Sequence, residues 1–336
     1  MIAKNRKKKS KLSGARPARR LSGNITGIDL RNVTTVSLCR RPSKVTANTF
    51  ASRLARPVSF GQFWNSLPSI LAGNNIKNLV KLILKAREKD KPVILTFGAH
   101  VIKCGLSPIL IDLAKRGLIT AFASNGASAI HDFELAYAGR TSEDVAVRLE
   151  DGSFGMARET GEFLNRAAKT ARDEGEGLGY TIGREIEKSR LPNRSLSVFA
   201  GAYRMGIPFT VHVAIGTDII YQHPQCDGGA WGHTSYKDFL KFADNVSRLG
   251  NGGVLVNFGS AVILPEVFLK ALTVCRNLGH KVAGFTTANF DMIRQYRPQQ
   301  NIVIRPTRAS GQGFDFAGHH EIMLPLLYAA LVDLIG

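Results

Sequence analysis

The hydrophobic positions after Pro57 follow two alternating spacings along the chain. Short runs that are apolar throughout, as in buried strands, cover residues 92–98, 118–124, 207–216, 252–259, 281–289 and 301–306. Between them, apolar side chains three or four positions apart predict helices over residues 60–89, 107–117, 129–138, 234–250, 264–279 and 319–335. Apolar strands separated by amphipathic helices are typical of a parallel sheet covered on both faces. The sequence therefore predicts a doubly wound, mostly parallel α/β fold.

Residues 139–190 interrupt this alternation. They are rich in acidic residues between Glu143 and Glu176, and a glycine-rich stretch, GEGLGYTIG, follows at residues 175–183. Helical spacing returns over residues 156–175 and 182–189. We therefore expect a helical insertion over one edge of the sheet, within a single domain that spans residues 58–336.

Charge is concentrated at the N-terminus of the 336-residue chain, whose formal net charge is +19. Residues 1–57 hold 15 lysines and arginines and one acidic residue, Asp29. Such a segment is typical of a solvated, disordered arm. Contact with RNA or another acidic partner is an alternative, since clustered lysine and arginine bind phosphate polymers. An organelle transit peptide is a third reading, because the segment is arginine-rich and poor in acids.

Other features of the sequence bear on compartment. No apolar segment follows the N-terminal charges as in a secretory signal peptide, and no run approaches the ~18 apolar residues of a membrane span. Four widely spaced cysteines, without a Cys-x-x-Cys pair, fit a reducing environment better than a disulfide framework. We therefore expect a cytoplasmic protein without membrane contact.

Small and polar residues follow most of the predicted strands. They lie at residues 98–100, 124–126, 216–218, 258–260 and 286–289. Ligands of open parallel sheets bind at the carboxyl ends of the strands, where helix N-termini offer N–H groups to anions. Asp218, directly after a strand, could accept hydrogen bonds from ribose hydroxyls. A nucleotide-sized ligand is one reading of these ends, and the ordinary preference of turns for such residues is the other.

Familiar catalytic motifs are absent, so histidines supply the remaining candidates. The chain has no GxxxxGK[ST] phosphate loop and no Gly-x-Ser-x-Gly elbow, and its GEGLG does not follow a strand. His223, Cys226 and His233 have a spacing that could bind zinc, although a polar loop is the simpler reading. His131, near the start of a predicted helix, is either part of a helix cap or an acid/base group facing a cleft.

The order of these segments resembles the deoxyhypusine synthase family across roughly residues 92–335. The stretch FGAHVIKCGLSPILIDLAKRGLITAFASNGASAIHDFELAYA is similar to the family's first cofactor strand and the helix that follows its Thr-Thr-Gly-Gly turn. TIGREIEKSRLPNRSLSVFAGAYRMGIPFTVHVAIGTD, GVLVNFGSAV and GFTTANFD resemble later segments of the family in order and spacing.

The resemblance implies a homotetramer of Rossmann-like subunits that uses NAD. Members of the family oxidise spermidine and transfer its aminobutyl group, through an imine on a lysine, to a protein lysine. The positions that match the family's NAD site are Ser124, Asn125, Gly126, Thr217, Asp218, Gly259, Ser260, Thr287, Ala288, Asn289 and Asp291.

This chain departs from the family at the residues that carry the transfer chemistry. No lysine follows Lys281, and the family's acidic pair is replaced by Ile130-His131. An imine needs an amine nucleophile, so deoxyhypusine synthesis itself is not expected. Loss of the acids disfavours a polyamine, and the arginines near residues 294–305 suit an anionic substrate better.

We therefore expect an NAD-dependent transferase or oxidoreductase that acts on an amine or another small molecule. His131 and His223 are the expected catalytic acid/base residues, with His233 behind them. One alternative is a non-catalytic nucleotide-binding protein whose basic arm contacts RNA or an acidic partner. Another is a metal-dependent hydrolase that uses His223, Cys226 and His233.

Overall fold

The computed structural model describes residues 28, 30–37, 40–42, 45–54 and 56–335. The chain divides into two compact units, residues 1–45 and residues 46–336. The described residues of the first unit form turns and extended segments without a helix or strand. Most of the basic arm predicted over residues 1–57 lies outside the described residues. Within the described ranges, no helix is both long and apolar enough to cross a membrane.

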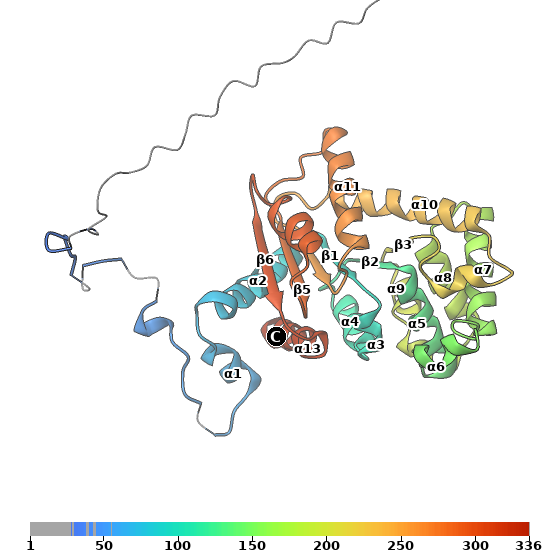
Figure 1. Cartoon of the computed structure of the whole chain (residues 1–336), viewed down its shortest axis with the longest axis horizontal. Coiled ribbons are helices and arrows are strands. Elements are labelled where there is room, and N and C mark those ends of the chain that lie inside the picture. The colour runs from blue at the N-terminus through green and yellow to red at the C-terminus, as the bar shows by residue number, and fades with distance from the viewer. Residues whose placement is uncertain (1–27, 29, 38–39, 43–44, 55, 336) are drawn as a thin grey trace, which may run out of the picture. The chain divides into compact units, whose positions relative to one another are not determined.

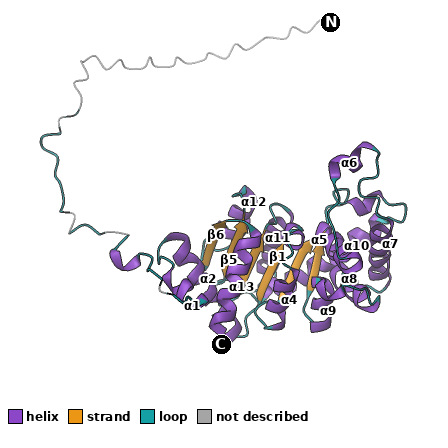
Figure 2. Cartoon of the chain, turned by 90° about the horizontal axis from the view of Figure 1, so that it is seen from below, coloured by secondary structure: helices purple, strands orange, loops and turns teal. Residues whose placement is uncertain are grey.

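The second unit is built on one six-stranded sheet, whose strands lie side by side in Figures 1 and 2. Its spatial order is β3-β2-β1-β4-β5-β6, and every neighbouring pair is parallel. This confirms the doubly wound, Rossmann-like sheet predicted from the sequence. The strands are β1 (Val93–Phe97), β2 (Ala121–Asn125), β3 (Phe209–His212), β4 (Val254–Phe258), β5 (Thr286–Asp291) and β6 (Gln312–Ala317).

Helices cover both faces of the sheet and create two hydrophobic cores. Leu95 and Phe97 of β1 belong to the core that also contains residues of α2 (Leu71–Glu88), α4 (Ser107–Lys115), α5 (Gly126–Ala138) and α13 (His320–Ile335). Ile94 points to the other core, which contains residues of α10 (Gly228–Ser247) and α11 (Ile263–Asn277). Because both faces are covered, β1 is buried along its whole length, as its continuous apolar sequence predicts.

Several shorter helices connect these elements. They are η1 (Ala47–Thr49), α1 (Phe60–Ser66), α3 (His100–Lys103), η2 (Arg194–Leu196), α9 (Val198–Met205), η3 (Ile219–Gln222) and α12 (Tyr296–Pro298). The long helix predicted over residues 60–89 is divided into α1 and α2 near Pro68, since proline disfavours helical backbone in the residue before it.

Residues 139–190 contain three helices, α6 (Val145–Glu150), α7 (Arg158–Asp173) and α8 (Leu178–Lys188). They lie at the β3 end of the sheet in Figure 1, and α8 packs against β3. A carboxylate oxygen of Asp238 on α10 accepts hydrogen bonds from the N–H groups of Gly179 (2.9 Å) and Val211 (2.7 Å), tying α8 to β3. A Cβ on Gly179 would lie 2.2 Å from the Phe209 carbonyl oxygen. The GEGLG stretch therefore serves the close approach of α8 to the sheet.

The prediction of a strand over residues 301–306 is wrong. Residues Gln299–Ile304 form a short π-helical segment, and the sixth strand follows at Gln312–Ala317. The Asn301 amide donates to Glu266 on α11 (2.9 Å), and Ile302 is fully buried in the core on that face. A three-residue apolar run fits a buried helical turn as well as a strand, and tertiary packing decides between them.

Candidate functional site

The sheet order reverses between β1 and β4, where ligands of doubly wound folds bind. Backbone approach is close at the carboxyl ends of these two strands. A Cβ on Gly98 would lie 2.4 Å from the Gly259 carbonyl oxygen, and Gly259 itself has φ of +62°. A Cβ on Gly259 would meet the ring of His320, the first residue of α13, at 2.2 Å. These positions accept only glycine without movement of their surroundings.

A row of polar side chains crosses four strands near their carboxyl ends. Thr96, Asn257, Asn289 and Asp315 are direct neighbours in register on β1, β4, β5 and β6. The Asn257 oxygen accepts from the Thr96 hydroxyl (2.9 Å), and its amide donates to Asn289 (2.8 Å). The Asn289 amide in turn donates to Asp315 (3.0 Å). Asn257 is fully buried, so the row fixes the strand ends through bonds that water does not weaken.

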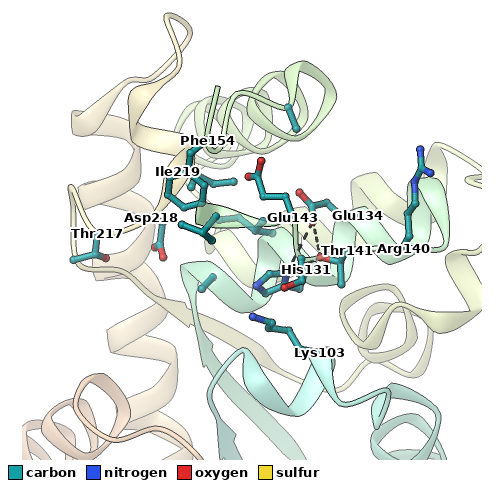
Figure 3. A pocket seen from close by; sticks show the side chains of 15 residues that line it. Lys103, His131, Glu134, Arg140, Thr141, Glu143, Phe154, Thr217, Asp218 and Ile219 are labelled. Carbon is teal, nitrogen blue, oxygen red and sulfur yellow. Dashed lines mark hydrogen bonds and ion pairs between the residues drawn. The ribbon is translucent and has the colours of Figure 1, made fainter. Parts of the chain in front are cut away.

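A pocket of about 470 Å³ opens beside β2 and β3, and we call it the α5 pocket. Figure 3 shows it between α5, the end of α3, the start of the insertion and the segment before η3. It is lined by Lys103, Ala127, Ile130, His131, Glu134, Arg140, Thr141, Ser142, Glu143, Val145, Phe154, Ala157, Thr217, Asp218 and Ile219. Six of these side chains are apolar and six are charged or titratable, so the pocket offers both apolar contact and polar groups that could orient a small molecule.

One wall of the α5 pocket combines a helix N-terminus with a carboxylate. The Asn125 side chain caps α5 by accepting from the Ser128 N–H (3.0 Å). Asp218 lies directly against that first turn, since a Cβ on Gly126 would be 2.3 Å from its Oδ2. Partial burial raises the pKa of Asp218 to about 6. A hydroxyl-bearing ligand at this wall would find a carboxyl acceptor and a helix N-terminus together.

The floor of the α5 pocket holds a chain of hydrogen bonds that starts at His131. Its Nδ1 lies 2.6 Å from the Thr141 hydroxyl, which donates to Glu134 at 2.5 Å (Figure 3). The second carboxylate oxygen of Glu134 accepts from the Thr160 hydroxyl at 3.1 Å. Burial, and then the nearby charge of Lys103, lower the pKa of His131 to about 4. The imidazole is therefore neutral at physiological pH.

The structure brings together some of the sequence-predicted cofactor residues. Thr217 and Asp218 line the α5 pocket, and Gly126 contacts Asp218 from α5. Ser124, in contrast, is buried and donates to the Phe97 carbonyl oxygen (2.7 Å), which joins β2 to β1. Its direct role is the support of the strands.

The predicted residues after β4 and within β5 lie at the far side of the switch point. Gly259 follows β4, and the Ser260 hydroxyl accepts from the Leu264 N–H (3.2 Å) in the first turn of α11. Thr287, Ala288 and Asn289 are buried in β5, with Asp291 at its end. The buried Thr287 hydroxyl has no hydrogen-bond partner among the described residues.

His223 lies outside the α5 pocket. Its Nε2 is 2.9 Å from the Gly155 carbonyl oxygen, and its ring packs so closely on Gly161 of α7 that a Cβ there would be 2.1 Å away. His233 is exposed on α10 and Cys226 is a free thiol. Across the described ranges, no group of three histidine, cysteine or acidic residues could hold a metal ion. Of the two predicted catalytic histidines, His131 lines the α5 pocket and His223 does not.

Three polar residues of the α5 pocket were not anticipated from the sequence. Glu134 is three positions from His131 on the same helix, a spacing that would have placed both on one face. Lys103 ends the short helix α3, directly after the carboxyl end of β1. Thr141 comes from the insertion by a tertiary contact that no sequence period encodes.

Comparison with known proteins supports the fold. No protein-family model matches this chain, and no curated protein sequence matches it. AgrE, solved as a ternary complex with ornithine and NAD+, has a similar fold with a TM-score of 0.52 and 16% identity; the match covers 78% of this chain and 33% of AgrE. The chain thus spans about a third of the length of that protein.

Two further solved structures have a similar fold. A conserved candidate LOR/SDH protein from Methanococcus maripaludis S2 has a TM-score of 0.50 and 17% identity, with 78% of this chain and 70% of that chain covered. A candidate deoxyhypusine synthase from Entamoeba histolytica has a TM-score of 0.51 and 11% identity, with 83% and 95% covered. The resemblance to deoxyhypusine synthases is thus supported as a distant relation of fold.

Proposed function

We propose that this chain is an NAD-dependent enzyme that oxidises a small substrate in the α5 pocket, as an oxidoreductase or as the first step of a group transfer. The observation that supports the proposal is the all-parallel sheet of order β3-β2-β1-β4-β5-β6. Its order reverses between β1 and β4, where Gly98 and Gly259 pack closely against each other. Dinucleotides bind across the carboxyl ends of such sheets.

The residues present fit a dinucleotide. Asp218 and the N-terminus of α5 would hold ribose hydroxyls at the α5 pocket. When bound, NAD supplies the acceptor for the hydride removed from the substrate. His131 would take up the substrate proton, because its imidazole is neutral and lines the same pocket.

Two similar folds support this proposal. AgrE was solved with NAD+ and ornithine, and the Entamoeba protein is a candidate member of a family that, by the resemblance above, uses NAD. The family's lysine chemistry is not carried over, because no lysine follows Lys281 in this chain. We therefore propose a changed substrate and not deoxyhypusine synthesis.

Calorimetry of NAD binding to the purified protein tests the proposal, with a thermal shift beside it. NAD at 100 times its Kd should stabilise the fold by about 2.7 kcal/mol, which raises Tm visibly. Asp218→Ala should weaken binding, whereas Asp244→Asn, on the exposed surface of α10, should leave it unchanged. Absence of binding at millimolar NAD would contradict the proposal.

Assembly and partners form a separate proposal. By the same resemblance we propose a homotetramer, which light scattering would detect as four times the 36.6 kDa chain mass. Contact of residues 1–57 with RNA or another acidic partner is proposed from their charge alone.

A further inference from the structure

We propose that Thr141 and Glu134 hold His131 with its hydrogen on Nδ1, which leaves the Nε2 lone pair as the base for a substrate that carries both a hydroxyl and a carboxylate, and that Lys103 binds this carboxylate. The inference rests on the proposed function for the oxidation step, but the state of His131 and the anion subsite can be tested without NAD.

The hydrogen-bond chain determines the tautomer. An ionised carboxylate only accepts hydrogen bonds, so the Thr141 hydroxyl must give its one hydrogen to Glu134 at 2.5 Å. The same hydroxyl can then only accept from His131, 2.6 Å away, and Nδ1 must carry the hydrogen. In a neutral imidazole this leaves the lone pair on Nε2, for which the described residues offer no hydrogen-bond partner.

Glu134 is held in a fixed position by two hydroxyl groups. Its two oxygens accept from different hydroxyls, Thr141 of the insertion and Thr160 of α7, so the carboxylate joins three elements at one point. Glu134 and Thr141 are therefore positioning residues, because they act on the substrate through the orientation of His131.

Lys103 defines what the ligand can be. It lines the α5 pocket close enough to depress the pKa of His131, and the described part of the chain offers it no ion-pair partner. A substrate carboxylate at Lys103 would offset this positive charge and so let His131 accept a proton more readily. The remaining charged side chains that line the pocket are Glu134, Arg140, Glu143 and Asp218.

A hydroxyl is the protic group that suits this base. An ammonium group would be repelled by Lys103, whereas an uncharged O–H can donate to Nε2 beside it. In the oxidation, the O–H proton would go to His131, and a C=O bond would form as the adjacent carbon loses its hydrogen with the electron pair, for which the NAD of the proposed function would supply the acceptor. Atoms and charge balance with no further reactant.

The first test reads the tautomer directly. Long-range 1H–15N spectra of the full-length protein labelled at histidine, with the His131 signals assigned through His131→Gln, should show Nδ1 protonated and Nε2 unprotonated at pH 7. Thr141→Ser keeps the hydroxyl and should keep this pattern. Thr141→Val removes the hydroxyl at nearly equal volume and should give a mixture of tautomers. A hydrogen on Nε2 in the wild-type protein would overturn the inference, whatever the result for NAD.

The second test probes the carboxylate subsite with four small compounds. 2-Hydroxybutyrate should raise the pKa of His131, and butyrate should do the same at higher concentration. 2-Hydroxybutyramide and 2-aminobutyrate should leave this pKa unchanged. Lys103→Met should raise the pKa of His131 in the free protein. It should also weaken the binding of 2-hydroxybutyrate about tenfold, as expected for loss of a charged hydrogen bond. Lys115→Met, on the exposed surface of α4 and outside the pocket lining, is the matched control and should leave both quantities unchanged. A His131 pKa unmoved by 2-hydroxybutyrate, or an unchanged affinity in Lys103→Met, would refute the anion subsite while leaving the NAD proposal standing.

Discussion

The affinity for NAD should depend on pH through one side chain, Asp218. Burial raises the pKa of its carboxyl to about 6, and the α5 pocket gives ligand hydroxyls access to it. Ribose hydroxyls donate hydrogen bonds, so they bind the ionised carboxylate more strongly than the protonated acid. We therefore expect NAD to bind more tightly as the pH rises through 6.

The size of the effect follows from the titration. With a pKa of about 6, the carboxyl is ionised in about one tenth of the molecules at pH 5 and in about nine tenths at pH 7. If NAD binds the ionised form, its Kd falls about tenfold over this interval, or about 1.4 kcal/mol. The pKa of His131, about 4, lies below the interval and contributes little to the change.

Calorimetry between pH 5 and 8 measures this dependence, and two variants test its origin. Asp218→Asn should bind like the wild type at pH 5, about tenfold more weakly at pH 7, and with a nearly constant Kd between them. Gly126→Ala should weaken binding at pH 7, because its Cβ would lie 2.3 Å from the Asp218 carboxylate and must displace it. A pH dependence that persists in Asp218→Asn would refute the assignment of this residue to the cofactor.

Three further predictions concern stability and the N-terminal segment. Burial raises the pKa of Asp238 to about 7, so the folded state holds this proton when the unfolded state has lost it, and stability falls as pH rises. Between pH 5 and 8 the free energy of unfolding of Asp238→Asn should fall by about 3 kcal/mol less than that of the wild type, as measured by urea unfolding at each pH. A variant whose stability falls as steeply with pH as the wild type would contradict this. Asn257→Ala breaks three buried hydrogen bonds and should lower the free energy of unfolding by about 3 kcal/mol. Thr96→Val breaks only the bond to Asn257 and should lower it by about 1 kcal/mol. Equal losses in urea unfolding would argue against a connected row of hydrogen bonds. Deleting residues 1–57 should abolish salt-dependent RNA binding and leave NAD affinity unchanged, and RNA binding that survives the deletion would exclude this segment as the contact.

The sequence predicted an element correctly where the spacing of its own apolar residues is enough to determine the structure. In β1, Leu95 and Phe97 face one core and Ile94 faces the other, so nearly every residue of the strand is apolar. This short apolar run could be recognised as a buried strand from the sequence alone. The sixth strand was missed because Phe314 and Phe316 are its only large apolar residues, with the half-buried Asp315 between them. The run at residues 301–306 was misassigned because three consecutive apolar residues show no distinguishable period.

The candidate site divides in the same way. Asp218 and His131 could be proposed because they lie just after a strand and near a helix start, positions that topology directs to one edge of the sheet. His223 was proposed on similar grounds, but its contact with Gly161 depends on the packing of η3 against α7, which sequence spacing does not reveal. Thr141 joins His131 to Glu134 from an insertion whose placement is likewise a tertiary matter.

The α5 pocket combines groups whose charges the protein itself leaves incompletely satisfied. Burial disfavours the charge of Asp218 and the protonation of His131, while Lys103 has no ion-pair partner in the described structure. Hydroxyl donors at Asp218 and a carboxylate at Lys103 would each relieve one of these costs, and the second would make His131 a stronger base. The ligands would then offset the part of the His131 pKa shift that comes from Lys103, while the larger part, which comes from burial, would remain.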